Sequence, residues 1–183
     1  MIFGDPTKIA VTYEVLSRQE NSHFAFGTFN IFIDDKLLLA GGSNWTIDCL
    51  VGYFKKTKAL SENEVFYLSS KEFLFSNACT TRGYLLHDSR QPAPEMWDSS
   101  DPAAIQAVDL YLKEIDDMRT DPPFGVELPL YAELVDQGLR IFLFASSRSE
   151  RIIFSLDSGK TILEKQVPRG TVDALINALP ECF

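Results

Sequence analysis

The chain has 183 residues, of which 45% are hydrophobic and 12% aromatic, so it can form one domain with a substantial core, and global disorder is excluded. Its formal net charge of −9 disfavours nucleic acid and anionic membrane as partners, because both attract surfaces rich in lysine and arginine. Residues 1–6 lack the basic and apolar regions of a signal peptide, and the sequence contains no 18-residue apolar run. We therefore expect a cytoplasmic protein without a membrane span.

The entire net charge lies in residues 95–136. That segment holds 11 acidic and 2 basic side chains, whereas residues 1–94 hold 10 and 9, and residues 137–183 hold 5 and 6. An acidic surface favours a basic partner, because complementary fields raise the association rate and select the partner. A solvated face that keeps the protein soluble is the alternative interpretation.

The N-terminal part is predicted to be rich in β-structure. Residues 8–16 alternate apolar and polar side chains, which is typical of a strand. Residues 23–33 are rich in aromatic and β-branched side chains and lead through Asp34, Asp35 and Lys36 into three leucines. This pattern predicts a β-hairpin with a short turn.

Helical spacing begins after the hairpin. Residues 47–54 have apolar side chains at i, i+3, i+4 and i+7, which predicts an amphipathic helix with Ser43 or Asn44 as its cap. The Ser-x-x-Glu pattern at residues 61–64 has the spacing of a capping box for a short second helix. The apolar residues around 72–75 fit either a helix or a strand.

A polar stretch precedes the next helix. Residues 88–101 contain two prolines and little apolar content, so we expect a flexible linker-like segment within a single domain spanning residues 1–183. Asp101 followed by Pro102 predicts a helix start, with aspartate as the N-cap and proline in the first helical position. The predicted buried stripe of this helix consists of Ile105, Val108, Leu112 and Ile115.

Strands return in the last third of the chain. Residues 138–145 are apolar on both faces, as in a central strand, and residues 151–156 and 162–167 are predicted to be further strands. Residues 172–179 have helical spacing and end at Pro180. The sequence therefore predicts an α+β fold, with an antiparallel β-sheet and about three to four helices packed mainly on one face.

The sequence contains no recognisable catalytic or metal-binding motif. His23 and His87 stand far apart and lack metal-ligand spacing, so we expect neither a metal nor a cofactor. Residues 159–161 (Gly-Lys-Thr) lack the earlier glycine that a phosphate-binding loop needs, which predicts a simple turn. The three widely spaced cysteines suggest free thiols rather than a disulfide framework. We expect a binding protein and not an enzyme, although a catalytic pair that meets only in the fold stays an open alternative.

Candidate contact residues come from the acidic segment. Trp97 is a large aromatic residue in a polar stretch, and interfaces favour such anchors, although packing back over the core is an equal alternative. Asp116 and Asp117 lie near the C-terminal end of the predicted helix, where the helix dipole mildly disfavours carboxylates. This penalty slightly favours a use of these carboxylates in binding, and a structural role at the helix end is the alternative. The predicted partner-binding residues are Glu95, Trp97, Asp98, Asp109, Glu114, Asp116, Asp117 and Asp121.

Several short motifs carry a resemblance to a known family. They are the start Met-Ile-Phe-Gly-Asp-Pro at residues 1–6, Ile-Asp-Asp at 33–35, Phe-Ser at 154–155 with Gly-Lys-Thr at 159–161, and Pro-Arg-Gly at 168–170. With these motifs the chain resembles the immunity 42 family, bacterial immunity proteins of polymorphic-toxin systems.

The resemblance spans nearly the whole chain, apart from residues 69–123, which match nothing in the family pattern. It implies an α+β protein of the producing cell's cytoplasm that neutralises a cognate toxin by direct binding, and it carries over no functional residues. The charge distribution adds that the toxin is basic, while the oligomeric state stays open. A secretion-type chaperone or another acidic protein-binding module is the alternative.

Overall fold

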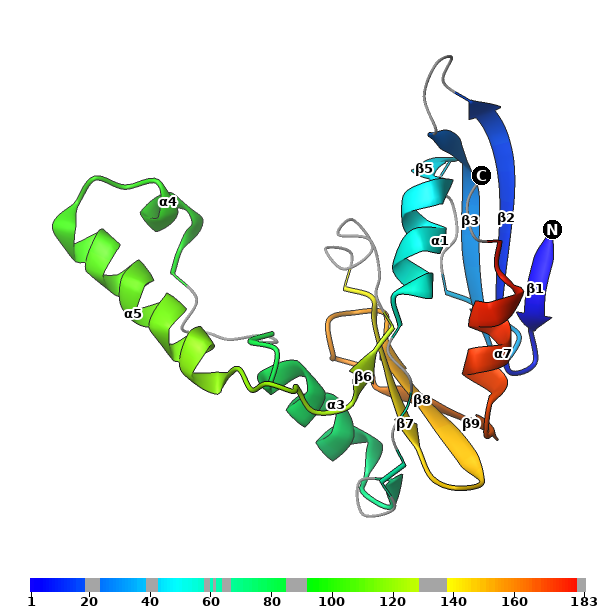
Figure 1. Cartoon of the computed structure of the whole chain (residues 1–183). Coiled ribbons are helices and arrows are strands. Elements are labelled where there is room, and N and C mark those ends of the chain that lie inside the picture. Colours follow the sequence, from blue (N-terminus) through cyan, green and yellow to red (C-terminus); the bar gives the residue numbers. More distant parts are fainter. Residues whose placement is uncertain are drawn as a thin grey trace.

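The computed structural model describes residues 1–18, 24–38, 43–57, 60, 62–63, 67–84, 92–128 and 138–180. These residues form two antiparallel β-sheets and five helices (Figure 1). The predicted α+β class is confirmed. The strands form two sheets where the sequence suggested one, and the described residues contain one helix more than the three to four expected.

The first sheet comes from the N-terminal part of the chain. Its strands are β1 (Ile2–Asp5), β2 (Ile9–Arg18), β3 (Ala25–Ile33) and β4 (Lys36–Leu37), with β5 (Ser43–Thr46) also paired to β3. The apolar side chains that alternate along β2 and β3 are buried, as period-2 patterning requires of a sheet with one core-facing side.

A two-residue turn closes the predicted hairpin. Asp34 and Asp35 have φ angles of 56° and 58°, and Ile33 pairs with Lys36 on either side of them. Positive φ at both central residues matches the right-handed twist of the flanking strands. The Asp34 carboxylate also pairs with Lys165, which links this turn to the second sheet.

The second sheet is formed by β6 (Val126–Glu127), β7 (Arg140–Ala145), β8 (Ser149–Ser155) and β9 (Leu163–Pro168), in that order. The predicted strands at 138–145, 151–156 and 162–167 are confirmed. The turn predicted at residues 159–161 is confirmed as well, since the Asp157 carboxylate accepts a hydrogen bond from the Thr161 amide at 2.8 Å.

Two hydrophobic cores lie on opposite sides of the second sheet. One contains the buried residues of β2 and β3, together with α1 (Ile47–Lys55) and α7 (Thr171–Ala178). The other contains α3 (Lys71–Thr80), which packs on the opposite face of β7 and β8. Successive residues of β7 alternate between the cores, which explains why this strand is apolar on both faces.

Some local expectations differ from the structure. The helix α1 begins after Thr46, and β5 occupies the positions where Ser43 and Asn44 were predicted to cap it. Because β5 pairs with β3, those residues belong to the sheet ladder. The ambiguous residues 72–75 are helical, in α3. The two residues of the predicted capping box, Ser61 and Glu64, lie outside the described residues, as do His23 and His87.

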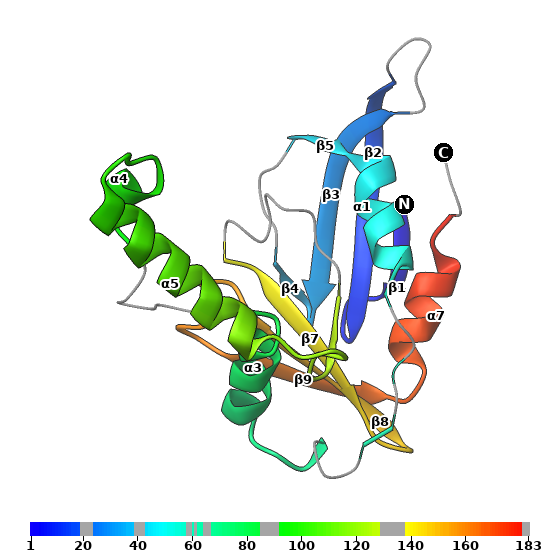
Figure 2. The ribbon, with the colours of Figure 1, turned by 60° about the vertical axis from the view of Figure 1, so that its left-hand side comes forward.

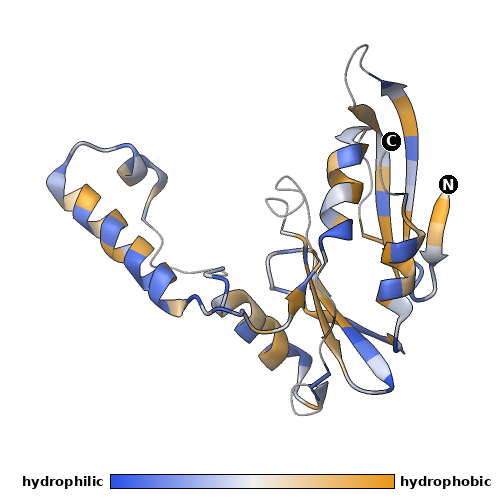
Figure 3. Cartoon of the chain, in the orientation of Figure 1, coloured by the Kyte–Doolittle hydropathy of each residue, from blue (hydrophilic) through white to orange (hydrophobic). Residues whose placement is uncertain are grey.

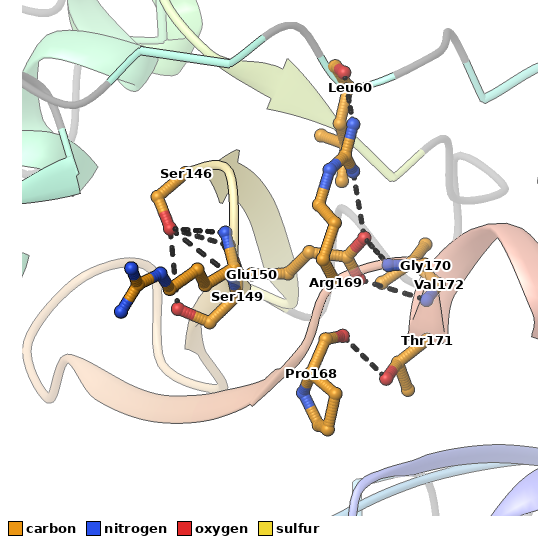
Figure 4. A network of polar contacts seen from close by, with 10 residues as sticks. Leu60, Ser146, Ser149, Glu150, Pro168, Arg169, Gly170, Thr171 and Val172 are labelled. Carbon is orange, nitrogen blue, oxygen red and sulfur yellow. Dashed lines mark hydrogen bonds and ion pairs between the residues drawn. The ribbon is translucent and has the colours of Figure 1, made fainter.

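A buried carboxylate joins the second sheet to α7 (Figure 4). Glu150 on β8 is 0% exposed, and it accepts hydrogen bonds from the backbone amides of Gly170 at 2.7 Å and Val172 at 3.0 Å. Arg169 donates to the same carboxylate at 2.9 Å and to the carbonyl of Leu60 at 2.8 Å. The negative charge therefore satisfies amides at the start of α7, where the helix dipole is positive.

Candidate partner-binding surface

Residues 92–121 form an arm that extends away from the two sheets in both Figure 1 and Figure 2. The arm contains the short helix α4 (Pro94–Trp97) and the 17-residue helix α5 (Pro102–Met118). At 1.5 Å per residue, α5 is roughly 25 Å long. The stretch 88–101, expected to be linker-like, thus includes a helix.

The start of α5 follows the sequence prediction. Asp101 is the N-cap, with its carboxylate accepting a hydrogen bond from the Ala103 amide at 3.0 Å, and Pro102 occupies the first turn. Proline fits there because its missing N–H would have no partner within the helix.

Trp97 packs within the arm. Its ring lies edge-on to Tyr111 of α5, with centroids 6.2 Å apart, and its indole N–H donates to the Pro92 carbonyl at 3.2 Å. Tyr111 and Ala104 are the buried residues of α5. Trp97 thus covers α5 and not the sheet core, and it keeps 41% of its surface exposed. Its role as an interface anchor stays a prediction.

The predicted buried stripe of α5 is wrong for two of its four members. Ile105 is 46% exposed and Leu112 is 42% exposed, whereas Val108 and Ile115 are partly buried. The helix rests on the face that carries Ala104 and Tyr111, and α4 packs against it. Figure 3 shows hydrophobic bands along α5 alternating with hydrophilic ones. The amphipathic pattern identified the helix correctly, but it could not show what covers the apolar face.

The arm concentrates negative charge. It carries eight acidic side chains against Lys113 and Arg119, a net charge of −6. Seven of these acids are exposed and Glu114 is partly buried. Asp116 pairs with Arg119 at 2.9 Å, but both side chains are more than half exposed, so the pair contributes little to stability.

All eight predicted contact residues therefore lie on one projecting element. Glu95 and Trp97 belong to α4, Asp98 follows it, Asp121 lies beyond α5, and the remaining four are on α5: Asp109, Glu114, Asp116 and Asp117. Of the other acids in residues 95–136, Glu133 and Asp136 lie outside the described residues.

The side chain of Arg82, which follows α3, attaches the arm by donating hydrogen bonds to main-chain carbonyls. Its guanidinium donates to the carbonyls of Phe124 at 2.7 Å and Gly125 at 2.8 Å, where the chain returns from the arm. The carbonyl of Thr81 accepts from the Thr120 amide at 3.1 Å. These bonds join the C-terminal end of α3 to the segment in which the chain returns from the arm.

A partly buried charge pair completes this attachment. Glu127 on β6 lies 3.3 Å from Arg82 and accepts a hydrogen bond from the Tyr84 hydroxyl at 3.0 Å. Burial raises the pKa of Glu127 and raises the pKa of Tyr84 to about 12, because both ionised forms lose hydration. Glu127 belongs to the acidic segment by sequence, but its place is internal. Arg82 and Tyr84 were missed by sequence reasoning, because nothing local marks an arginine that binds distant carbonyls.

The described part of the chain contains neither a cluster of metal-ligand side chains nor a membrane-spanning helix. No group of three or more His, Cys, Asp or Glu side chains in these ranges is arranged to hold a metal ion. Likewise, none of the helices in these ranges has the length and apolar character that crossing a bilayer requires. The acids of the arm are thus spread along its surface.

Known proteins resemble the chain over nearly its full length. An uncharacterized protein of Pasteurella multocida (strain Pm70) is 23% identical over 189 residues, covering 99% of each chain. The crystal structure of CdiI from Burkholderia dolosa AUO158 superimposes with a TM-score of 0.62 at 16% identity, covering 97% of this chain and 96% of that one. This likeness shows that the two share a fold.

The family model of immunity protein 42 matches residues 1–181. The match includes the middle of the chain, which the sequence motifs alone did not relate to the family. The chain therefore belongs to the immunity protein 42 family.

Proposed function

We propose that this protein binds and neutralises a cognate toxin domain in the cytoplasm of the cell that produces both, and that it acts by binding and not by catalysis. Membership of an immunity protein family supports the general role. The observation that carries the mechanism is the arm, a projecting element with a net charge of −6. A structural helix would be expected to pack its apolar face on a sheet, but α5 does not.

The arm's charge suggests the chemistry of the partner. Opposed charges on two proteins raise association rates and reject partners of the wrong sign. A toxin domain that acts on nucleic acid would carry a basic surface for its substrate, and the acidic arm would bind that surface in competition with the substrate. The contact residues in this proposal are the eight predicted from sequence.

The experiment measures association of the purified protein with the toxin domain encoded beside its gene. The test variant is Asp109→Lys/Asp117→Lys, and the matched control is Glu14→Lys/Glu72→Lys, which reverses two exposed acids outside the arm. We expect the arm variant to lower the association rate roughly tenfold or more at low salt and to weaken its dependence on ionic strength.

Four outcomes separate the alternatives. A larger effect of the arm variant than of the control supports the arm as the contact surface. Equal effects of both variants place the contact elsewhere. If the parent protein neither binds the folded toxin domain nor protects cells that express it, neutralisation itself is refuted. Binding to the unfolded toxin alone would indicate a secretion-type chaperone instead.

A further inference from the structure

An apolar ridge on α5 remains uncovered. Ile105 and Leu112 are 46% and 42% exposed, and the partly buried Val108 lies between them in the sequence. At 100° per residue, positions 105, 108 and 112 fall within about 60° of one another around the helix. They therefore form one continuous strip, which we call the ridge.

The ridge is not the face by which α5 is held. Tyr111 and Ala104, on a neighbouring face, are buried, and Tyr111 packs against Trp97. At the other end, Ile115 lies close to Gly83. A Cβ atom added at residue 83 would be only 2.7 Å from the Ile115 Cγ2 methyl group. Both ends of α5 are thus fixed from one side, and the ridge faces solvent on a helix that already has its conformation.

Carboxylates border the ridge on one side. Asp109 and Asp116 stand four residues after Ile105 and Leu112, so each lies one helical turn along the same side of α5. Both are exposed. A second copy of this chain would bring its own arm, with a net charge of −6, against an arm of the same charge. Charge complementarity therefore favours a basic partner over self-association.

We infer that the ridge inserts into an apolar groove on the toxin domain, and that Lys or Arg side chains at the rim of this groove meet Asp109 and Asp116. This inference rests on the proposed function and adds the binding mode, a helix lying in a groove with anchors at i, i+3 and i+7. The apolar anchors determine how long the complex lasts, whereas the carboxylates determine how fast it forms.

The test uses the full chain with two apolar residues replaced by glutamine. The variant is Ile105→Gln/Leu112→Gln, and the control is Leu110→Gln/Leu68→Gln, which removes two exposed leucines away from the ridge, one of them on the same helix. We expect the ridge variant to weaken binding of the purified toxin domain roughly 10- to 100-fold through faster dissociation, with an unchanged salt dependence of association. The control variant should bind within a factor of three of the parent.

A second measurement does not depend on the stability of a variant. A photoreactive benzoylphenylalanine at position 105 should crosslink to the toxin domain, and the same group at position 110 should not. A ridge variant that binds as the parent does, or crosslinking at 110 but not at 105, would overturn the inference while leaving neutralisation intact. A parent dimer that the ridge variant dissociates would show that a second copy covers the ridge, which also overturns it. If the parent does not bind the toxin domain at all, both proposals fail.

Discussion

Replacement of Glu150 by glutamine tests how the second sheet and α7 are held together. The substitution keeps the shape of the side chain and removes its charge. Three donors surround the carboxylate: the amides of Gly170 and Val172 and the guanidinium of Arg169 (Figure 4). A glutamine side chain has one carbonyl oxygen, and its NH₂ group would face one of these donors.

The expected cost follows from this geometry. Hydrogen bonds to charged groups contribute about 1.5–3 kcal/mol each, and a buried donor left without a partner costs about 1–3 kcal/mol. We therefore expect Glu150→Gln to lower the free energy of unfolding by roughly 3–5 kcal/mol. With a urea dependence of about 2 kcal/mol per molar, the unfolding midpoint should fall by roughly 1.5–2.5 M.

Urea unfolding followed by circular dichroism measures the change, and hydrogen exchange of the Val172 amide reports the local effect. Glu72→Gln is the matched control, because the Glu72 side chain is 62% exposed and should change stability by less than about 0.5 kcal/mol. Combining Glu150→Gln with Arg169→Met should cost less than the sum of the single changes. If Glu150→Gln costs no more than the control, or the two changes are additive, the carboxylate does not hold α7 as described.

Three further results are expected from urea unfolding. Gly27→Ala should lower the free energy of unfolding by roughly 3 kcal/mol, because the added Cβ would lie 1.8 Å from the Glu14 carbonyl oxygen. The control Gly52→Ala has open space around the added Cβ and should not be destabilising. Equal stabilities of the two variants would refute the close approach of β2 and β3. Burial raises the pKa of the Cys79 thiol from 9.0 to about 12, so the contribution of this thiol to the free energy of unfolding is complete below pH 9 and is lost as the pH rises. Between pH 8 and 10.5 the free energy of unfolding of the parent should fall by about 2 kcal/mol more than that of Cys79→Ala. Equal falls for the two proteins would contradict this reasoning. Ile105→Gln should cost less than about 0.5 kcal/mol, and a cost of several kcal/mol would mean that Ile105 is buried.

Much of the fold could be predicted because its signals are local. The alternation along β2, the paired aspartates at 34–35 and the Asp101 cap act within a few residues, so reading them required no tertiary information. The division of the strands into two sheets could not be read in this way. It depends on which faces of β7 meet α3 and which meet α1, and that is decided by packing between distant segments.

The same limit applies to the candidate surface: local patterns could be read from the sequence, whereas contacts between distant segments could not. Charge counting identified the acidic segment 95–136, because a net charge needs no geometry, but it did not predict that most of this segment projects as an arm. The ridge was assigned to the core, because an amphipathic stripe has the same spacing whether a sheet or a partner covers it. Arg82 gave no signal, since its partners are carbonyls of residues 42 and 43 positions away.

The attachment of the arm has a consequence for how such proteins diversify. Arg82 binds main-chain carbonyls of Ala78, Phe124 and Gly125, which every amino acid possesses. None of these three hydrogen bonds involves a side chain of α5. Under the proposed function, mutations of these side chains can therefore change which toxin is recognised while the scaffold beneath stays intact.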